Sequence, residues 1–117
     1  DAVGWALLAR IVCHEILPAD IDRVIALDVG DVLVLSDILE LWGEFQQFQA
    51  HHVFAASYTN TLHHVNAGVV LYDMGKMRRR NFTDDVIRAA TIGLEEGRGD
   101  CIHDQSIINT LYRRGAK

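Results

Sequence analysis

Short, fully apolar runs that end on polar residues recur along this chain, and they restrict its fold more than any other feature. The run Arg23-Val-Ile-Ala-Leu27 ends on Asp28, and Ala67-Gly-Val-Val-Leu-Tyr72 ends on Asp73. Continuous apolarity without alternation is typical of a buried strand in a parallel sheet. We therefore expect strands near residues 23–28, 53–58 and 67–73, and a further short strand at 32–35.

Segments with helical spacing separate these runs. Apolar residues follow a helical period near residues 6–16, 38–45, 83–94 and 105–113. Pro18 should end the first helix, because a residue that precedes proline is driven out of the α region. Asp37 and Thr83 are the expected N-caps of the second and third helices. Polar residues 59–66 are expected to form a loop. Strands that alternate with helices indicate an α/β fold.

Length and composition narrow the class of protein further. The chain has 117 residues, of which 50% are hydrophobic and 23% charged, so it forms one domain or a piece of one. The net charge of −5 gives no basic field for nucleic acid. No apolar stretch approaches the roughly 20 residues that span a bilayer. Because the chain starts at Asp1 and not at Met, we interpret the chain as a fragment. Cys13 and Cys101 are too few for a disulfide scaffold.

Two carboxylates follow the first strand, in the segment Asp28-Val-Gly-Asp31. The carboxyl ends of strands are where open α/β sheets bind their ligands. Two hard oxygen donors at this position could share a divalent cation that neutralises phosphate. A simple Asp/Gly turn remains the alternative interpretation.

Two further polar clusters stand at element ends. Asn66-Ala67-Gly68 enters the second apolar run, where the amide could bind a sugar hydroxyl and the glycine permits close approach of the backbone. Asp104 and Gln105 open the last helix, where both could equally be caps.

The run Arg78–Arg80 is interpreted as a solvated helix end rather than an anion site.

In this order the clusters resemble the nucleotide-sugar glycosyltransferases of family 8, and within them the xylosyl-transferring animal-type branch. The matching stretches are Ile16-Leu-Pro-Ala-Asp-Ile-Asp-Arg-Val-Ile-Ala-Leu-Asp28, Asp31-Val-Leu-Val-Leu-Ser-Asp-Ile-Leu-Glu-Leu-Trp42, Val65-Asn-Ala-Gly-Val-Val-Leu-Tyr-Asp-Met-Gly-Lys-Met-Arg78 and Asp104-Gln-Ser-Ile-Ile-Asn109. They span nearly the whole chain. The resemblance implies a Rossmann-like GT-A fold, here partial, with three α/β/α layers and a mixed sheet.

The resemblance also assigns roles to residues. The Asp-x-Asp motif of the family, which holds Mn²⁺ and the donor diphosphate, is stretched here by one residue, so that Asp28 matches its first acid and Asp31 its metal-binding second acid. Asn66, Ala67 and Gly68 correspond to the segment beside the donor sugar. Asp104 and Gln105 match the pair near the reacting anomeric carbon, and Ser106 replaces the second Asp that is common in the family.

The implied activity is metal-dependent transfer of a sugar from a UDP-sugar donor to a glycan or glycoprotein hydroxyl, with xylose favoured over glucose or galactose. That is the reaction of a hexosyl- or pentosyltransferase. The family's first nucleotide-binding strand has no counterpart before Asp1, and its last metal-ligand histidine would follow Lys117. We therefore expect residues 1–117 to be one partial catalytic domain, which need not be active alone. Family members of this branch imply a Golgi or secretory-pathway location.

Two alternatives use the same residues. The segment from Val24 to Val34 also resembles the first motif of haloacid-dehalogenase-type phosphatases, with Asp28 as nucleophile, Ser57 and Lys76 as the second and third motifs, and the acids at 100 and 104 as the fourth. That family requires a buried strand before Gly99-Asp100, where this chain is polar. The other alternative is a pseudo-transferase, which binds a nucleotide sugar without turnover.

Overall fold

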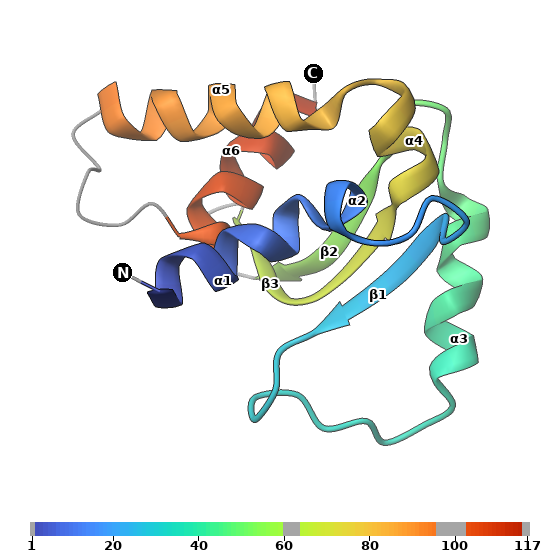
Figure 1. Ribbon diagram of the computed structural model, residues 1–117. Helices are drawn as coiled ribbons and strands as arrows, with labels where there is room; N and C mark the ends of the chain where they lie inside the picture. The colour runs from blue at the N-terminus through green and yellow to red at the C-terminus, as the bar shows by residue number, and fades with distance from the viewer. Residues whose placement is uncertain (1, 60–63, 96–102, 116–117) are drawn as a thin grey trace.

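A computed structural model describes residues 2–59, 64–95 and 103–115 (Figure 1). The expected helices and strands follow one another in the expected order, except that the strand at 32–35 is absent and one further helix follows the third strand. The elements are α1 (Ala2–Ile11), α2 (Cys13–Ile16), β1 (Arg23–Leu27), α3 (Ile38–Gly43), the 3₁₀ helix η1 (Glu44–Gln47), β2 (Phe54–Thr59), β3 (His64–Asp73), α4 (Met74–Arg79), α5 (Phe82–Glu95) and α6 (Asp104–Gly115).

The three strands form one sheet in the order β1-β3-β2. Both outer strands run antiparallel to β3, with Arg23 opposite Asp73 and Phe54 opposite Tyr72. The parallel pairing that we expected for the apolar run of β1 is therefore wrong among the described strands. A short strand packed on both faces is continuously apolar whatever its direction, so composition alone does not distinguish the two arrangements.

Three local expectations also differ from the structure. Residues 32–35 form no strand, and Leu33 and Leu35 are 78% and 85% exposed. The expected loop 59–66 is shorter, because β2 continues to Thr59 and β3 begins at His64, while residues 60–63 lie outside the described part. Helix α5 begins at Phe82, so Thr83 lies inside its first turn and bonds to His14 and Glu15 instead of capping the helix.

Other helix ends agree with the sequence. Helix α2 ends at Ile16, ahead of Pro18, and Asp37 caps α3 by accepting the Leu39 N–H at 2.9 Å. Arg78 is more than the solvated helix end that we expected. Its guanidinium donates to backbone carbonyls between His14 and Ile21 and so fixes the segment that leads from α2 into β1.

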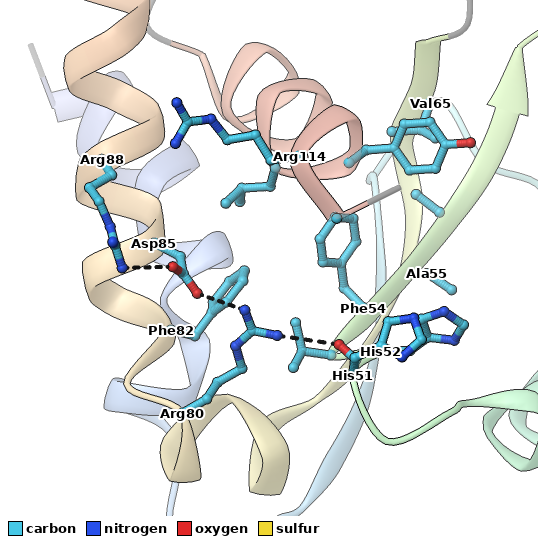
Figure 2. Close-up of a pocket in the computed structure, with 15 residues that line it drawn as sticks. His51, His52, Phe54, Ala55, Val65, Arg80, Phe82, Asp85, Arg88 and Arg114 are labelled. Atoms are coloured by element: carbon cyan, nitrogen blue, oxygen red, sulfur yellow. Dashed lines mark hydrogen bonds and ion pairs between the residues drawn. The ribbon is translucent and has the colours of Figure 1, made fainter. Parts of the chain in front are cut away.

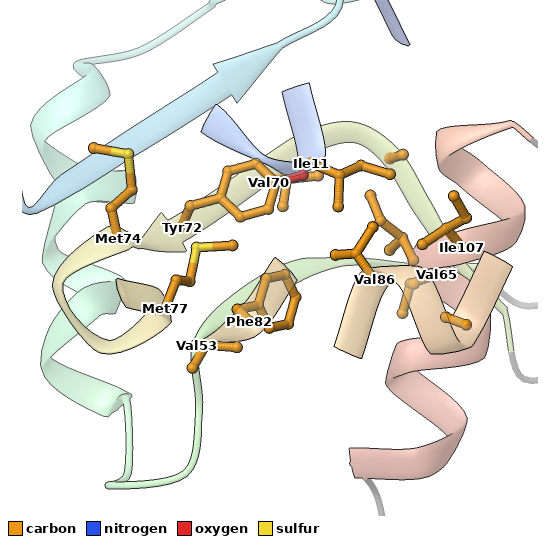
Figure 3. Packing of buried hydrophobic residues seen from close by; sticks show 13 residues of the cluster. Ile11, Val53, Val65, Val70, Tyr72, Met74, Met77, Phe82, Val86 and Ile107 are labelled. Atoms are coloured by element: carbon orange, nitrogen blue, oxygen red, sulfur yellow. The ribbon is translucent and has the colours of Figure 1, made fainter. Parts of the chain in front are cut away.

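The hydrophobic core lies between the sheet and helices α1, α5 and α6, which gather on one face of it (Figures 1 and 3). Helix α3 lies on the side away from α5. The core comprises Ile11, Val53, Val65, Ala67, Val70, Tyr72, Met74, Met77, Phe82, Val86, Ala89, Ile107 and Ile108. This arrangement confirms the α/β class. Within the described residues no helix has the length and apolarity needed to cross a bilayer.

Candidate functional site

The first two polar clusters meet where β1 ends. The Asp28 N–H donates to the Gly68 carbonyl at 2.9 Å, which extends the β1–β3 pairing by one residue. The Gly68 N–H in turn donates to Asn66 Oδ1 at 2.6 Å. A Cβ on Gly68 would lie 2.8 Å from Asn66 Oδ1 and 3.6 Å from Asp28 Oδ2. A side chain at Gly68 would therefore crowd Asn66 Oδ1, whereas Asp28 Oδ2 would be at ordinary contact distance, so the glycine leaves room for the Asn66 amide in its present position.

Arg10 connects this cluster to the third one. One of its terminal nitrogens donates to Asp28 Oδ1 and the other to Asp104 Oδ2. The side chains of Arg10 and Asp104 are 18% and 9% exposed, whereas that of Asp28 is 39% exposed. Charge-assisted bonds of this kind are the strong ones. Arg10 therefore ties α1, the end of β1 and the start of α6 into one site.

Our sequence analysis did not single out Arg10, although a signal was present. It is the one charged residue between Ala2 and Cys13. A lone cation on an otherwise uncharged, apolar helix is expected to have a partner, because burying an unpaired charge is costly. The partners could not be named in advance, since Asp104 lies 94 residues away in sequence.

Gln105 and Asn109 hold α6 against β3 through its backbone. The Ala67 N–H donates to Gln105 Oε1 at 2.8 Å, and the Gln105 amide donates back to the Val65 carbonyl. The Val65 N–H donates to Asn109 Oδ1 at 2.9 Å. These contacts lie beside a register shift, where Ala56 pairs with Val70 but Ser57 pairs with Asn66. Strand β1 pairs only with residues 69–73 of β3, so the side chains of α6 bond to β3 backbone that lies beyond the end of β1.

Asp31 is placed differently from the other acids. It is exposed in the loop after β1, and no ion pair or hydrogen bond joins it to Asp28 or Asp104 within the described part of the chain. Gly30 has φ +96°, a left-handed conformation that side chains disfavour. Gly30 therefore lets the backbone turn between Asp28 and Asp31 in a way that most residues would not.

These residues fit a divalent metal only in part. Among the described residues, no group of three or more His, Cys, Asp or Glu side chains is arranged to hold an ion. Asp28 and Asp31 supply carboxylate oxygens of the kind that Mn²⁺ prefers, and one oxygen of Asp28 is already bonded to Arg10. Two carboxylates of this kind do not by themselves make a complete metal site.

A separate cavity of about 770 Å³ opens along the outer edge of β2, between that strand and helices α5 and α6 (Figure 2). Its wall includes Arg80 and Arg88, which donate to the Asp85 carboxylate at 3.2 and 3.0 Å, and Arg114. None of our candidate site residues lines this cavity. The site that the three clusters form is therefore distinct from it.

The fold of the chain is similar to that of two solved glycosyltransferases. The chain resembles mouse xyloside xylosyltransferase 1 in its apo form, with a TM-score of 0.71, 19% identity, and coverage of 91% of this chain and 47% of that one. It also resembles the galactosyltransferase LgtC, in complex with donor and acceptor sugar analogs, with a TM-score of 0.61, 26% identity, and coverage of 88% and 40%.

The comparisons confirm the partial Rossmann-like GT-A fold that we expected. The chain spans less than half the length of either glycosyltransferase. Neither protein-family models nor curated proteins match its sequence.

Proposed function

We propose that this protein is a glycosyltransferase of the family 8 type, which transfers a sugar from a UDP-sugar to a glycan hydroxyl. Xylose is the favoured sugar. The observation that carries the proposal is the pair of Asp28 and Asp104 on Arg10, with Asn66 beside Gly68, the residue that pairs with Asp28, at a strand end of a GT-A fold. The likeness to a xylosyltransferase and to a galactosyltransferase supports sugar transfer as the reaction class.

Each clustered residue has a proposed role. Asp28 faces the ribose or shares the cation, while the Asn66 amide binds a hydroxyl of the donor sugar beside Ala67 and Gly68. Asp104 lies near the anomeric carbon. Gln105 holds Asp104 in place, because its own amide is bonded to the β3 backbone.

Asp31 and Asp28 are the proposed protein ligands of Mn²⁺. When bound, the ion would neutralise negative charge on the departing diphosphate. The remaining ligands come from the donor or from residues other than these two, because the described part of the chain offers no third one.

The transfer itself is a substitution at the anomeric carbon. The acceptor oxygen forms a bond to that carbon and the bond from the carbon to the diphosphate oxygen breaks. UDP leaves, and the hydroxyl proton of the acceptor passes to the departing diphosphate oxygen. Positive charge develops on the sugar ring, and the buried carboxylate of Asp104 can stabilise it in a site partly withdrawn from water.

The geometry disfavours the phosphatase alternative. Lys76 follows Asp73, which pairs with Arg23 at the start of β1, whereas Asp28 follows the end of that strand. The five residues of β1 separate the position of Asp73, close to Lys76 in the chain, from that of Asp28 by roughly 16 Å. A lysine at that distance does not share a phosphate with Asp28. The stretch before position 99, where that family requires a buried strand and this chain is polar, lies in part outside the described residues.

One experiment separates the three functions. The whole protein is incubated with UDP-xylose, Mn²⁺ and a glycan acceptor, and separately with a chromogenic phosphate and Mg²⁺. We expect UDP release in the first reaction and no phosphate in the second. Phosphate release without UDP release would support the phosphatase. Binding of UDP-xylose with neither product would support the pseudo-transferase.

We further propose that residues 1–117 are part of a longer catalytic domain located in the Golgi or secretory-pathway lumen. The half-length coverage of both solved glycosyltransferases supports the first statement, and the family resemblance supports the second. Activity measurements therefore use the whole protein.

A further inference from the structure

Two buried polar atoms beside the site have no hydrogen-bond partner among the described residues. They are the hydroxyl of Tyr72 and the Nε of Arg10. Tyr72 is 1% exposed, and its ring lies within the hydrophobic core. Buried polar groups without partners are rare in folded proteins, and each costs about 1–3 kcal/mol. Such a pair therefore calls for a physical explanation.

The two atoms belong to neighbouring elements. Tyr72 stands on the face of β3 that packs against the helices, and Figure 3 shows its ring reaching toward Ile11 of α1, the residue next to Arg10. The charges of Arg10, Asp28 and Asp104 all act on the hydroxyl. Burial raises the pKa of Tyr72, so the hydroxyl keeps its proton at working pH.

Packing alone does not explain a tyrosine at position 72. Phenylalanine would fill the same volume of core without burying an unpaired hydroxyl. The guanidinium of Arg10 also has an unpaired donor. Both terminal nitrogens donate to carboxylates, whereas Nε has no acceptor among the described residues. The structure therefore contains an acceptor and a donor that are both buried and both without a partner in the described part of the chain.

We propose that Tyr72 is a positioning residue for Arg10. When Asp28 turns from the guanidinium toward a bound UDP-sugar, the Tyr72 hydroxyl accepts the Arg10 Nε–H. Arg10 then keeps its bond to Asp104, and the Asp104 carboxylate stays in place beside the sugar. The inference rests on the proposed function for the identity of the ligand, but the contact between Tyr72 and Arg10 can be tested without it.

The first test replaces the hydroxyl alone, by Tyr72→Phe in the whole protein. We expect unfolding temperature to stay the same or rise, while the affinity for UDP-xylose, measured by calorimetry, falls roughly five- to tenfold. Tyr112→Phe, a half-buried tyrosine on α6 outside the site, is the matched control and should leave the affinity unchanged. A more stable Tyr72→Phe variant with unchanged affinity would show that the hydroxyl is only a packing defect and would overturn the proposal.

The second test needs no sugar. Asp28→Asn weakens the hold of residue 28 on the guanidinium, so the Arg10 Nε–H should become protected from solvent exchange, as measured by nuclear magnetic resonance. Adding Tyr72→Phe should abolish that protection. If the wild-type protein binds no UDP-xylose but the protection follows this pattern, the proposed function fails and the contact stands. If UDP-xylose binds but Nε–H protection does not depend on Tyr72, the contact is rejected and the transferase remains.

Discussion

Arg10 shows how one side chain can organise a site built from distant parts of the chain. Its guanidinium compensates two carboxylates, one of them almost fully buried. Without that cation the buried Asp104 carboxylate would lose a charged partner, which is costly for a buried charge. The negative charge that we assign to the sugar-binding side of the site therefore depends on Arg10.

Arg10→Met should destabilise the chain by about 2–4 kcal/mol, because it leaves the buried Asp104 carboxylate without its partner. Adding Asp104→Asn should restore part of the loss, since the uncompensated charge is then removed. Urea unfolding of the two single variants and the double variant forms a thermodynamic cycle that measures the coupling. Strictly additive effects would show that the ion pair contributes nothing to stability.

The two acids of the stretched motif should divide their work. We expect Asp31→Asn to weaken Mn²⁺-dependent UDP-xylose binding of the whole protein more than Asp28→Asn does. Asp104→Asn should lower kcat with little change in donor affinity, as when an interaction made in the transition state is lost. Calorimetry with and without Mn²⁺, together with steady-state kinetics, checks both statements. Unchanged Mn²⁺ dependence in Asp31→Asn, with its loss in Asp28→Asn, would reverse the assignment.

Among the secondary-structure elements, α6 is fixed to β3 by side chains that substitute for strand pairing. Asn109 is 7% exposed, and the Val65 residue that it binds is 3% exposed. Asn109→Ala should therefore cost about 1–3 kcal/mol, because it leaves the buried backbone N–H of Val65 without an acceptor. Thr110→Ala is the control and should cost less, because Thr110 is only half-buried and its hydroxyl donates within the helix. Equal losses in urea unfolding would contradict this account.

Helices α2 and α5 meet at a buried histidine. His14 is 3% exposed and lies 3.1 Å from the Thr83 hydroxyl, and burial lowers its pKa below the usual 6.5. Below that pH the unfolded chain binds a proton that folded His14 resists, so stability should fall as the pH drops below about 6.5. His14→Gln should flatten this dependence in urea unfolding at pH 7.5 and 5.5. An unchanged slope would show that His14 does not cause it.

How much of these elements the sequence predicts depends on how local the determinants are. Asp37 and Pro18 mark helix ends through their own backbone and side chain, so both were readable. The direction of β1 relative to β3 could not be predicted, because β3 lies more than 40 residues away in sequence and apolar content does not encode direction. The polar clusters were recognisable as candidates, but the Arg10 contacts that join Asp28 to Asp104 exist only after folding.

At the scale of the whole molecule, the segment after the site is unusually apolar for a surface. Val29, Leu33, Leu35 and Leu39 are each more than two-thirds exposed, and none belongs to the hydrophobic core. Monomeric proteins rarely expose contiguous apolar surface of this kind, and where they do it marks an interaction surface. This chain also covers less than half of either solved glycosyltransferase. The exposed segment is thus a candidate contact surface in a larger assembly or longer chain.

The 117-residue chain on its own should therefore bind an apolar dye and associate as its concentration rises, because burying these side chains against any apolar surface is favourable. Leu33→Glu combined with Leu35→Glu should reduce dye fluorescence and sedimentation-detected association. It should leave the unfolding temperature nearly unchanged, since both side chains lie outside the core. Ile87→Glu, at an exposed position on α5, is the control and should leave association unaltered. Two results would show that residues 29–39 pack against the rest of the chain in solution. One is a chain that stays monomeric without binding dye, and the other is a double variant that unfolds at a markedly lower temperature.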